Sequence, residues 1–131
     1  MTTAFAMRAY RQVESQGIPG EKLYLLGLDG ILEYLRRAEG ALKGDGDMAV
    51  KGESLGRAYR LVEHLLAALP EEGAATGQPD LGERLAGIYR YLLDRLAQAN
   101  IFDDAQAVED CRTVVRTLRE SWQGAVVAAA D

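Results

Sequence analysis

Apolar residues recur at alternating intervals of three and four along four separate stretches of the 131-residue chain. Residues three and four apart lie on one face of an α-helix, so each stretch predicts a helix with a single apolar stripe. The sequence "KGDGD", Pro70 and Asn100 separate the stretches. The pattern predicts an all-α fold, an antiparallel up-down four-helix bundle with helices at about 21–43, 48–69, 80–99 and 103–128.

The four stripes are built from leucine, other aliphatic residues, one cysteine and one tryptophan. In chain order they are Leu28, Ile31, Leu35, Ala38 and Leu42; Leu55, Ala58, Val62, Leu65 and Leu69; Leu81, Leu85, Ile88, Leu92, Leu96 and Ala99; and Val108, Cys111, Val115, Leu118, Trp122 and Ala125. Such stripes predict one core within residues 20–131. Residues 1–19, with Gly17 and Pro19 near their end, are expected to form a separate, partly ordered N-terminal arm.

Polar residues mark the expected ends of the third and fourth helices. Asp80 stands three residues before Glu83, which is the spacing of an N-cap and its capping-box partner. Asn100 is a suitable C-cap for the third helix. Asp103 and Gln106 have the same capping-box spacing, so they are expected to begin the fourth helix.

The tetrapeptide Gly27-Leu28-Asp29-Gly30 contains an Asp-Gly pair, which is a turn signal in isolation. The apolar stripe from Leu28 to Leu42 continues through it, so we predict uninterrupted helix. The two glycines lie three residues apart on neighbouring faces, where the N-terminal arm or a partner is expected to approach the backbone closely.

Charge and composition exclude several classes of partner. A net charge of −5 and an isoelectric point near 4.9 argue against a surface that follows nucleic-acid phosphates. No apolar run approaches the roughly 20 residues that span a bilayer, and the first residues lack the organisation of a signal peptide. The lone Cys111 excludes an internal disulfide and suits a reducing compartment. We therefore expect a cytoplasmic protein without membrane insertion or nucleic-acid binding.

The sequence carries no recognisable catalytic, metal or cofactor motif. A di-iron site in a bundle needs Glu-x-x-His pairs, but His64 is the only histidine and no such pair occurs. Both His64, on the flank of a core stripe, and Cys111, within one, are interpreted as structural residues. No catalytic residue, metal or cofactor is therefore expected.

A second set of apolar residues flanks the four stripes. These residues either widen the buried faces or line grooves in which an amphipathic partner helix docks. Tyrosine suits a groove rim because its ring is buried while its hydroxyl stays in water. The flanking set is Leu25, Leu32, Tyr59, Leu66, Tyr89, Leu93 and Val114.

Along nearly its whole length the chain resembles the flagellin-specific export chaperones of the FliS family. The segments that carry the resemblance are, in order, "AYRQVE", "EKLYLLGLDGILEYLRRAEGAL", "GRAYRLVEHLLAAL", "LAGIYRYLLDRLAQAN" and "LRESW". Two features depart from the family pattern: Gly27-Leu28 stands where relatives usually carry Leu-Tyr, and the loop "PEEGAATGQP" replaces a short Gly-Gly turn.

The resemblance implies a non-enzymatic cytoplasmic chaperone. Members of the family bind the disordered C-terminal segment of flagellin, prevent its premature polymerisation and deliver it to the flagellar type III export apparatus. In the family the N-terminal segment can cover part of the partner-binding surface and be displaced. By that resemblance Met7, Tyr10 and Val13 are expected to form a removable plug, and Tyr10 joins the flanking set as a partner-binding residue.

Two other functions stay open at this point. Small helical bundles such as the chorismate mutases perform catalysis with arginines that converge in a polar pocket, and Arg36, Arg37 and Arg84 are the candidates for such a role. The chain could also be a chaperone-like regulatory protein with another client. The enzyme predicts converging cations inside a polar pocket, whereas the chaperone predicts apolar surface grooves.

Overall fold

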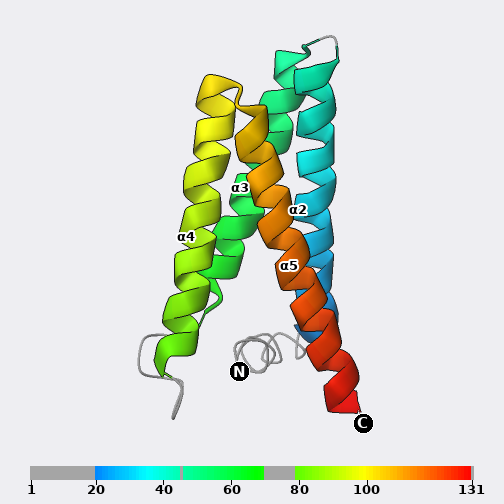
Figure 1. Ribbon diagram of the computed structural model, residues 1–131, viewed down its shortest axis with the longest axis vertical. Coiled ribbons are helices and arrows are strands. Elements are labelled where there is room, and N and C mark those ends of the chain that lie inside the picture. The colour runs from blue at the N-terminus through cyan, green and yellow to red at the C-terminus, as the bar shows by residue number, and fades with distance from the viewer. Residues whose placement is uncertain (1–19, 45, 70–78, 131) are drawn as a thin grey trace.

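The computed structural model describes residues 20–44, 46–69 and 79–130, which form four helices (Figure 1). They are α2 (Gly20–Lys43), α3 (Met48–Ala67), α4 (Pro79–Phe102) and α5 (Ala105–Ala130). Consecutive helices pack against each other, and α5 closes the ring by packing against α2. The all-α prediction and the four-helix bundle are confirmed. The plug residues Met7, Tyr10 and Val13 lie outside the described residues.

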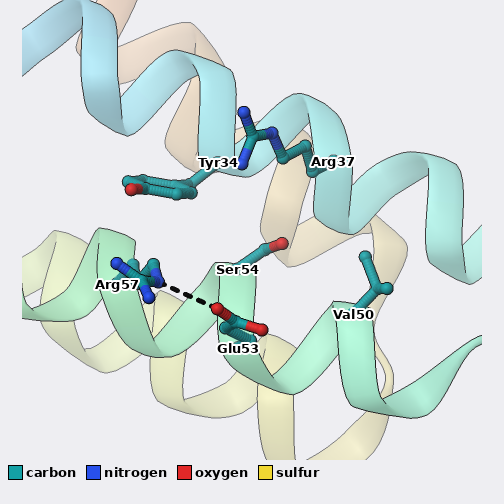
Figure 2. A pocket seen from close by; sticks show the side chains of 6 residues that line it. All are labelled: Tyr34, Arg37, Val50, Glu53, Ser54 and Arg57. Carbon is teal, nitrogen blue, oxygen red and sulfur yellow. Dashed lines mark hydrogen bonds and ion pairs between the residues drawn. The ribbon is translucent and has the colours of Figure 1, made fainter.

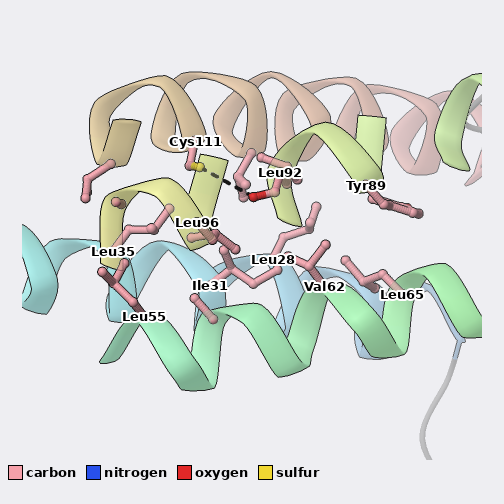
Figure 3. Close-up of a cluster of buried hydrophobic side chains, with 14 of the residues drawn as sticks. Leu28, Ile31, Leu35, Leu55, Val62, Leu65, Tyr89, Leu92, Leu96 and Cys111 are labelled. Carbon is pink, nitrogen blue, oxygen red and sulfur yellow. Dashed lines mark hydrogen bonds between the residues drawn. The ribbon is translucent and has the colours of Figure 1, made fainter. Parts of the chain in front are cut away.

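The core is made of the predicted stripes. Each leucine that leaves water contributes roughly 1.5–3 kcal/mol to folding, so the four stripes supply the main stabilising term. Leu42, Leu69, Ile88 and Leu118 are only partly buried and pack around the edge of the core. The buried stripe residues, many of them visible in Figure 3, are Leu28, Ile31, Leu35, Ala38, Leu55, Ala58, Val62, Leu65, Leu85, Leu92, Leu96, Ala99, Val108, Cys111, Val115 and Trp122.

Helix α2 runs without interruption through Gly27-Leu28-Asp29-Gly30, as predicted. The described neighbours of the two glycines belong to α3, whereas the N-terminal arm lies outside the described residues. A Cβ atom at Gly30 would lie 3.2 Å from a methyl carbon of Leu61, and one at Gly27 would lie 3.9 Å from Leu65. Both neighbours belong to α3, so the glycines leave room for side chains of this helix among the described residues.

The turn between α4 and α5 corrects the predicted helix ends. Helix α4 continues past Asn100 to Phe102, and Asp103 takes the left-handed conformation with φ 51°. The amide of Asp104 donates to the Ala99 carbonyl at 3.1 Å, which is the long hydrogen bond of a Schellman C-cap. The Asp104 side chain then accepts from the Ala107 amide at 3.1 Å and caps α5.

The other predicted caps also change. Helix α4 begins at Pro79, so Asp80 lies within its first turn and not before it. Gln106 donates to the Asp110 carboxylate at 3.0 Å instead of serving a capping box. At the start of α3, Asp47 is the N-cap, because its carboxylate accepts from the amides of Ala49 and Val50.

A buried lysine ties the start of α3 to the end of α4. Lys51 is 8% exposed, and its ammonium donates to the Asn100 carbonyl at 2.8 Å and pairs with Asp103 at 2.7 Å. A cation at a helix C-terminus satisfies a carbonyl that has no partner within the helix and interacts favourably with the helix dipole. Lys51 therefore holds α3 and α4 together at the end of the bundle where the α2–α3 and α4–α5 connections lie.

Within the described ranges, no helix has the length and apolar character that crossing a membrane requires.

Replacing Lys51 by methionine is expected to lower the free energy of unfolding by about 1–3 kcal/mol, because the side chain keeps its apolar stem while the Asn100 carbonyl loses a charged donor. Urea unfolding followed by circular dichroism measures the change. Lys43→Met is the control, since the Lys43 side chain is 68% exposed and lies 3.7 Å from Glu39. Equal losses in the two variants would contradict this role of Lys51.

Candidate partner-binding site

An open, shallow apolar groove lies between helices α4 and α5 on one edge of the bundle. Figure 1 shows the two helices close together at their shared turn and further apart toward the start of α4. The groove between them has a volume of about 440 Å³ and is open to solvent. We call it the α4/α5 groove; its lining residues are Arg84, Gly87, Ile88, Tyr91 and Val114.

The lining of the α4/α5 groove suits an apolar side chain from a partner. Ile88 and Val114 are half-buried against the core, and a Cβ atom at Gly87 would meet nothing within 4 Å. Tyr91 is 43% exposed, so its ring offers apolar surface that the bundle leaves uncovered. Amphipathic helices dock by placing side chains three and four residues apart into such grooves.

A polar pair closes the groove on the side of the α4–α5 turn. Arg95 and Asp110, one turn from Tyr91 and Val114 respectively, join across the two helices. Hydrogen bonds from Gln106 and then from Arg95 lower the pKa of Asp110 from its usual value. The pair holds this part of α5 against α4 and defines where the groove begins.

The predicted partner-binding residues are divided among three edges of the bundle. Val114 lies in the α4/α5 groove. Leu25 and Leu32 lie on the side of α2 that carries Asp29, whose carboxylate bonds Arg119 of α5. These two leucines therefore belong to the α2/α5 edge.

Three further candidates lie at the α3/α4 edge. Gly52 of α3 faces Asn100 of α4. Tyr59 and Leu66 follow Gly52 at heptad spacing, and Leu93 precedes Asn100 by seven residues, so the three share this edge. All are partly buried and pack against the core. The structure thus does not bring the predicted set into one groove.

The position of the Tyr89 side chain differs from the prediction. The ring was expected at a groove rim with its hydroxyl in water, but Tyr89 is completely buried in the core. Its hydroxyl bonds the Tyr24 hydroxyl at 3.0 Å, and the Tyr24 ring centre lies 4.3 Å from that of Trp122. Burial raises the pKa of Tyr24, although the hydrogen bond from Tyr89 lowers it in part.

The exposed tyrosine of α4 is Tyr91, which sequence reasoning missed as a groove residue. Residues two apart on a helix point to nearly opposite sides, so Tyr89 and Tyr91 cannot both face the core. Both tyrosines lie near the stripe residue Leu92. The stripe alone therefore does not predict which of the two side chains is buried. The spacing of Tyr91 from Ile88 and Arg84, at three and seven residues, is the signal that places it with them.

The arginines considered for an enzyme do not converge. Arg36 and Arg37 both bond the exposed Glu33, and these hydrogen bonds lower the pKa of Glu33 to about 2. Arg84 lines the α4/α5 groove. Cys111 is buried in the core, and burial raises the pKa of its thiol to about 12, so the thiolate that nucleophilic catalysis needs is suppressed.

Comparison with known proteins agrees with the resemblance in the sequence. The family model described as "Flagellar protein FliS" matches residues 2–129. The flagellar secretion chaperone FliS of Salmonella typhimurium is 32% identical over 129 residues, covering 94% of this chain and 91% of the relative. The Escherichia coli protein of that name is 31% identical, covering 98% and 94%. The Bacillus subtilis one is 30% identical, covering 90% and 84%.

Tyr89→Phe and Tyr91→Phe form a matched pair that tests the placement of the two tyrosines. Tyr89→Phe is expected to cost about 1 kcal/mol of stability, because it removes a buried hydrogen bond to Tyr24. Tyr91→Phe is expected to stay within about 0.5 kcal/mol of the unmodified protein, since its ring is partly exposed. Thermal or urea unfolding measures both. A larger loss in Tyr91→Phe would reverse the assignment.

Proposed function

The chain belongs to the FliS family of flagellar secretion chaperones, and from that premise we propose that its client is the disordered C-terminal segment of flagellin. In this proposal the protein acts in the bacterial cytoplasm. It covers the segment, prevents premature polymerisation and delivers flagellin to the flagellar type III export apparatus. The chemistry is binding and release, without catalysis.

The observation that carries the proposal is the α4/α5 groove. Ile88, Tyr91 and Val114 offer apolar surface between two helices, and an amphipathic helix of the client would bury it. A segment that is disordered when free loses conformational freedom as it folds onto the chaperone, which offsets part of the binding energy. That cost is compatible with a client that must be released again at the export apparatus.

The half-buried residues at the other two edges extend this surface. Leu25 and Leu32 at the α2/α5 edge, and Tyr59, Leu66 and Leu93 at the α3/α4 edge, are partly exposed apolar side chains next to the core. A long disordered segment can contact several edges in succession. In the proposal the α4/α5 groove is the main site and the other edges are secondary contacts.

The N-terminal arm is proposed to cover part of this surface when no client is bound. By family resemblance, Met7, Tyr10 and Val13 supply the apolar side chains of the plug. Its apolar residues and those of the client would then compete for the same surface. The client would displace the arm, which lowers the affinity by the free energy of arm docking.

Co-purification with flagellin tests the client and the groove together. Full-length flagellin is expected to be retained by the chaperone, whereas flagellin without its last roughly 40 residues, a length that exceeds an average helix several-fold, is not. Val114→Asp is expected to weaken retention at least tenfold, because it places a charge in an apolar site. Thr113→Asp, with the same charge on the exposed neighbour, is the control.

Retention of both flagellin forms alike, or of neither, would contradict the proposed client. Equal retention by Val114→Asp and Thr113→Asp would move the site away from the α4/α5 groove. Leu66→Asp and Leu93→Asp, which alter the α3/α4 edge, then decide whether that edge is the main one. Circular dichroism of each variant distinguishes lost binding from lost folding.

Deleting residues 1–17 tests the proposed plug. The shortened chain is expected to keep its helical content and melting transition, since the described core is formed by residues of α2 to α5. Its affinity for a flagellin C-terminal peptide, measured by isothermal titration calorimetry, is expected to rise or stay unchanged. Unfolding of the shortened chain, or loss of peptide binding, would contradict a displaceable plug.

A further inference from the structure

The end of the bundle at which the α2–α3 and α4–α5 connections lie carries exposed apolar side chains. Figure 1 shows this end opposite the start of α2 and the end of α5. Ile101 and Phe102, the last two residues of α4, are 70% and 72% exposed, and Met48, the first residue of α3, is 44% exposed. We call these three residues the tip surface.

The Lys51 bridge brings the start of α3 next to the exposed pair of α4. The Lys51 ammonium bonds the Asn100 carbonyl and the Asp103 carboxylate, which belong to the residues on either side of that pair. Met48 stands three residues before Lys51, so it lies on the same side of α3 and one turn nearer the helix start. Val50, also exposed, instead lines a cavity between α2 and α3 (Figure 2).

Hydrogen bonds at the helix ends hold the tip surface in one arrangement. The left-handed Asp103 and the bond from the Asp104 amide back into α4 end that helix directly after Phe102. Asp47 caps α3 at the residue before Met48. A surface that is fixed before binding loses little conformational freedom when a partner docks. Large apolar side chains that stay exposed side by side mark an interaction site.

Aspartates give the tip surface a negative rim. Among the described residues, the charged ones at the ends of α2 and α4 and at the starts of α3 and α5 are Lys43, Asp47, Lys51, Asp103 and Asp104. Glu39 pairs with Lys43 at 3.7 Å, so three carboxylates and the Lys51 ammonium leave a formal charge of −2. Two helix C-termini and two helix N-termini meet at this end, so their dipoles largely cancel.

The acidic rim argues against three other occupants. A symmetric contact with a second copy would place each rim of aspartates against the same residues, and three side chains are few for the roughly 800 Å² that each partner of a stable complex buries. The rim also repels the surface of anionic lipids and the phosphates of nucleic acid. A positively charged protein segment meets neither objection.

We propose that the tip surface binds a short segment of another protein in which apolar side chains are flanked by lysine or arginine. The apolar side chains cover Ile101, Phe102 and Met48, while the cations face Asp47 and Asp104. The small area suits a contact that forms and dissociates readily. The inference does not depend on the proposed client, because the α4/α5 groove is lined by other residues.

The first test uses the full-length protein and a blocked peptide, acetyl-Lys-Leu-Leu-Lys-Arg-amide. The chain has two phenylalanines, Phe5 and Phe102, so labelling with 4-fluorophenylalanine gives two fluorine resonances, which Phe5→Tyr assigns. The peptide is expected to shift the Phe102 resonance. Peptides with serine in place of leucine, or glutamate in place of the cations, are expected to leave it unchanged. No shift with the first peptide, or an equal shift with either control, would overturn the proposal.

Paired variants test the apolar part of the tip surface. Ile101→Ser is expected to weaken the fluorine response to the basic peptide severalfold and to leave the melting temperature nearly unchanged, because the side chain is mostly in water. Leu26→Ser, the same kind of change at a residue of α2 that is 60% exposed, is expected to keep the full response. Equal responses in the two variants would overturn the assignment to the tip.

A second pair of variants tests the acidic rim. Asparagine caps a helix as well as aspartate, so Asp47→Asn with Asp104→Asn removes two charges and keeps both caps. This double variant is expected to bind the basic peptide severalfold more weakly than the unmodified protein. Glu63→Gln with Glu83→Gln removes two exposed charges late in α3 and early in α4 and is the control. Equal affinities in the two double variants would contradict the role of the rim.

The other occupants are tested with the same Ile101→Ser variant. The unmodified protein is expected to sediment as a monomer and to stay unbound when mixed with phosphatidylglycerol vesicles. Self-association that Ile101→Ser abolishes would overturn the proposal in favour of a second copy. Vesicle binding that Ile101→Ser abolishes would overturn it in favour of a lipid surface.

Discussion

The burial of one apolar stripe from each helix is the constraint on which the rest of this structure depends. Leu28 and Ile31 of α2, Val62 of α3 and Leu92 of α4 are almost completely enclosed, so none of them is available to a partner. Binding must therefore use the residues on either side of each stripe. These flanking residues are partly buried because the apolar face of each helix is wider than its contact with the neighbouring helix. The outer part of that face therefore lies at the edge of the bundle.

Short polar connections set how far the helices separate. The capped turn through Asp103 and Asp104 and the Lys51 bridge hold α3, α4 and α5 together at one end. Further from this end, the ion pair between Arg95 and Asp110 again joins α4 to α5. Beyond that pair the open α4/α5 groove lies between the two helices, so its position follows from where the polar contacts between them stop.

Most of the fold was predictable from the sequence, because heptad spacing reports directly which face of a helix is buried. The helix ends were less predictable. Ile101 and Phe102 extend α4 although both are about 70% exposed, and the left-handed Asp103 ends it through backbone hydrogen bonds that carry little sequence signal.

The candidate site was predictable only in part. Periodicity identified Val114 as a flanking residue, yet it could not decide between Tyr89 and Tyr91, because both lie beside the same stripe. Gly30 indicated that some group packs closely against α2, but only the structure identifies a described one, the Leu61 side chain of α3.

Site-specific photocrosslinking tests the proposal that the α4/α5 groove holds the flagellin C-terminal segment. A photoreactive phenylalanine analogue at position 91 lies in the groove, and one at position 101 lies at the exposed end of α4. Position 91 is predicted to crosslink full-length flagellin and not the form without its C-terminal segment, with little product from position 101. Equal crosslinking from both positions, or capture of the shortened flagellin at position 91, would contradict the account.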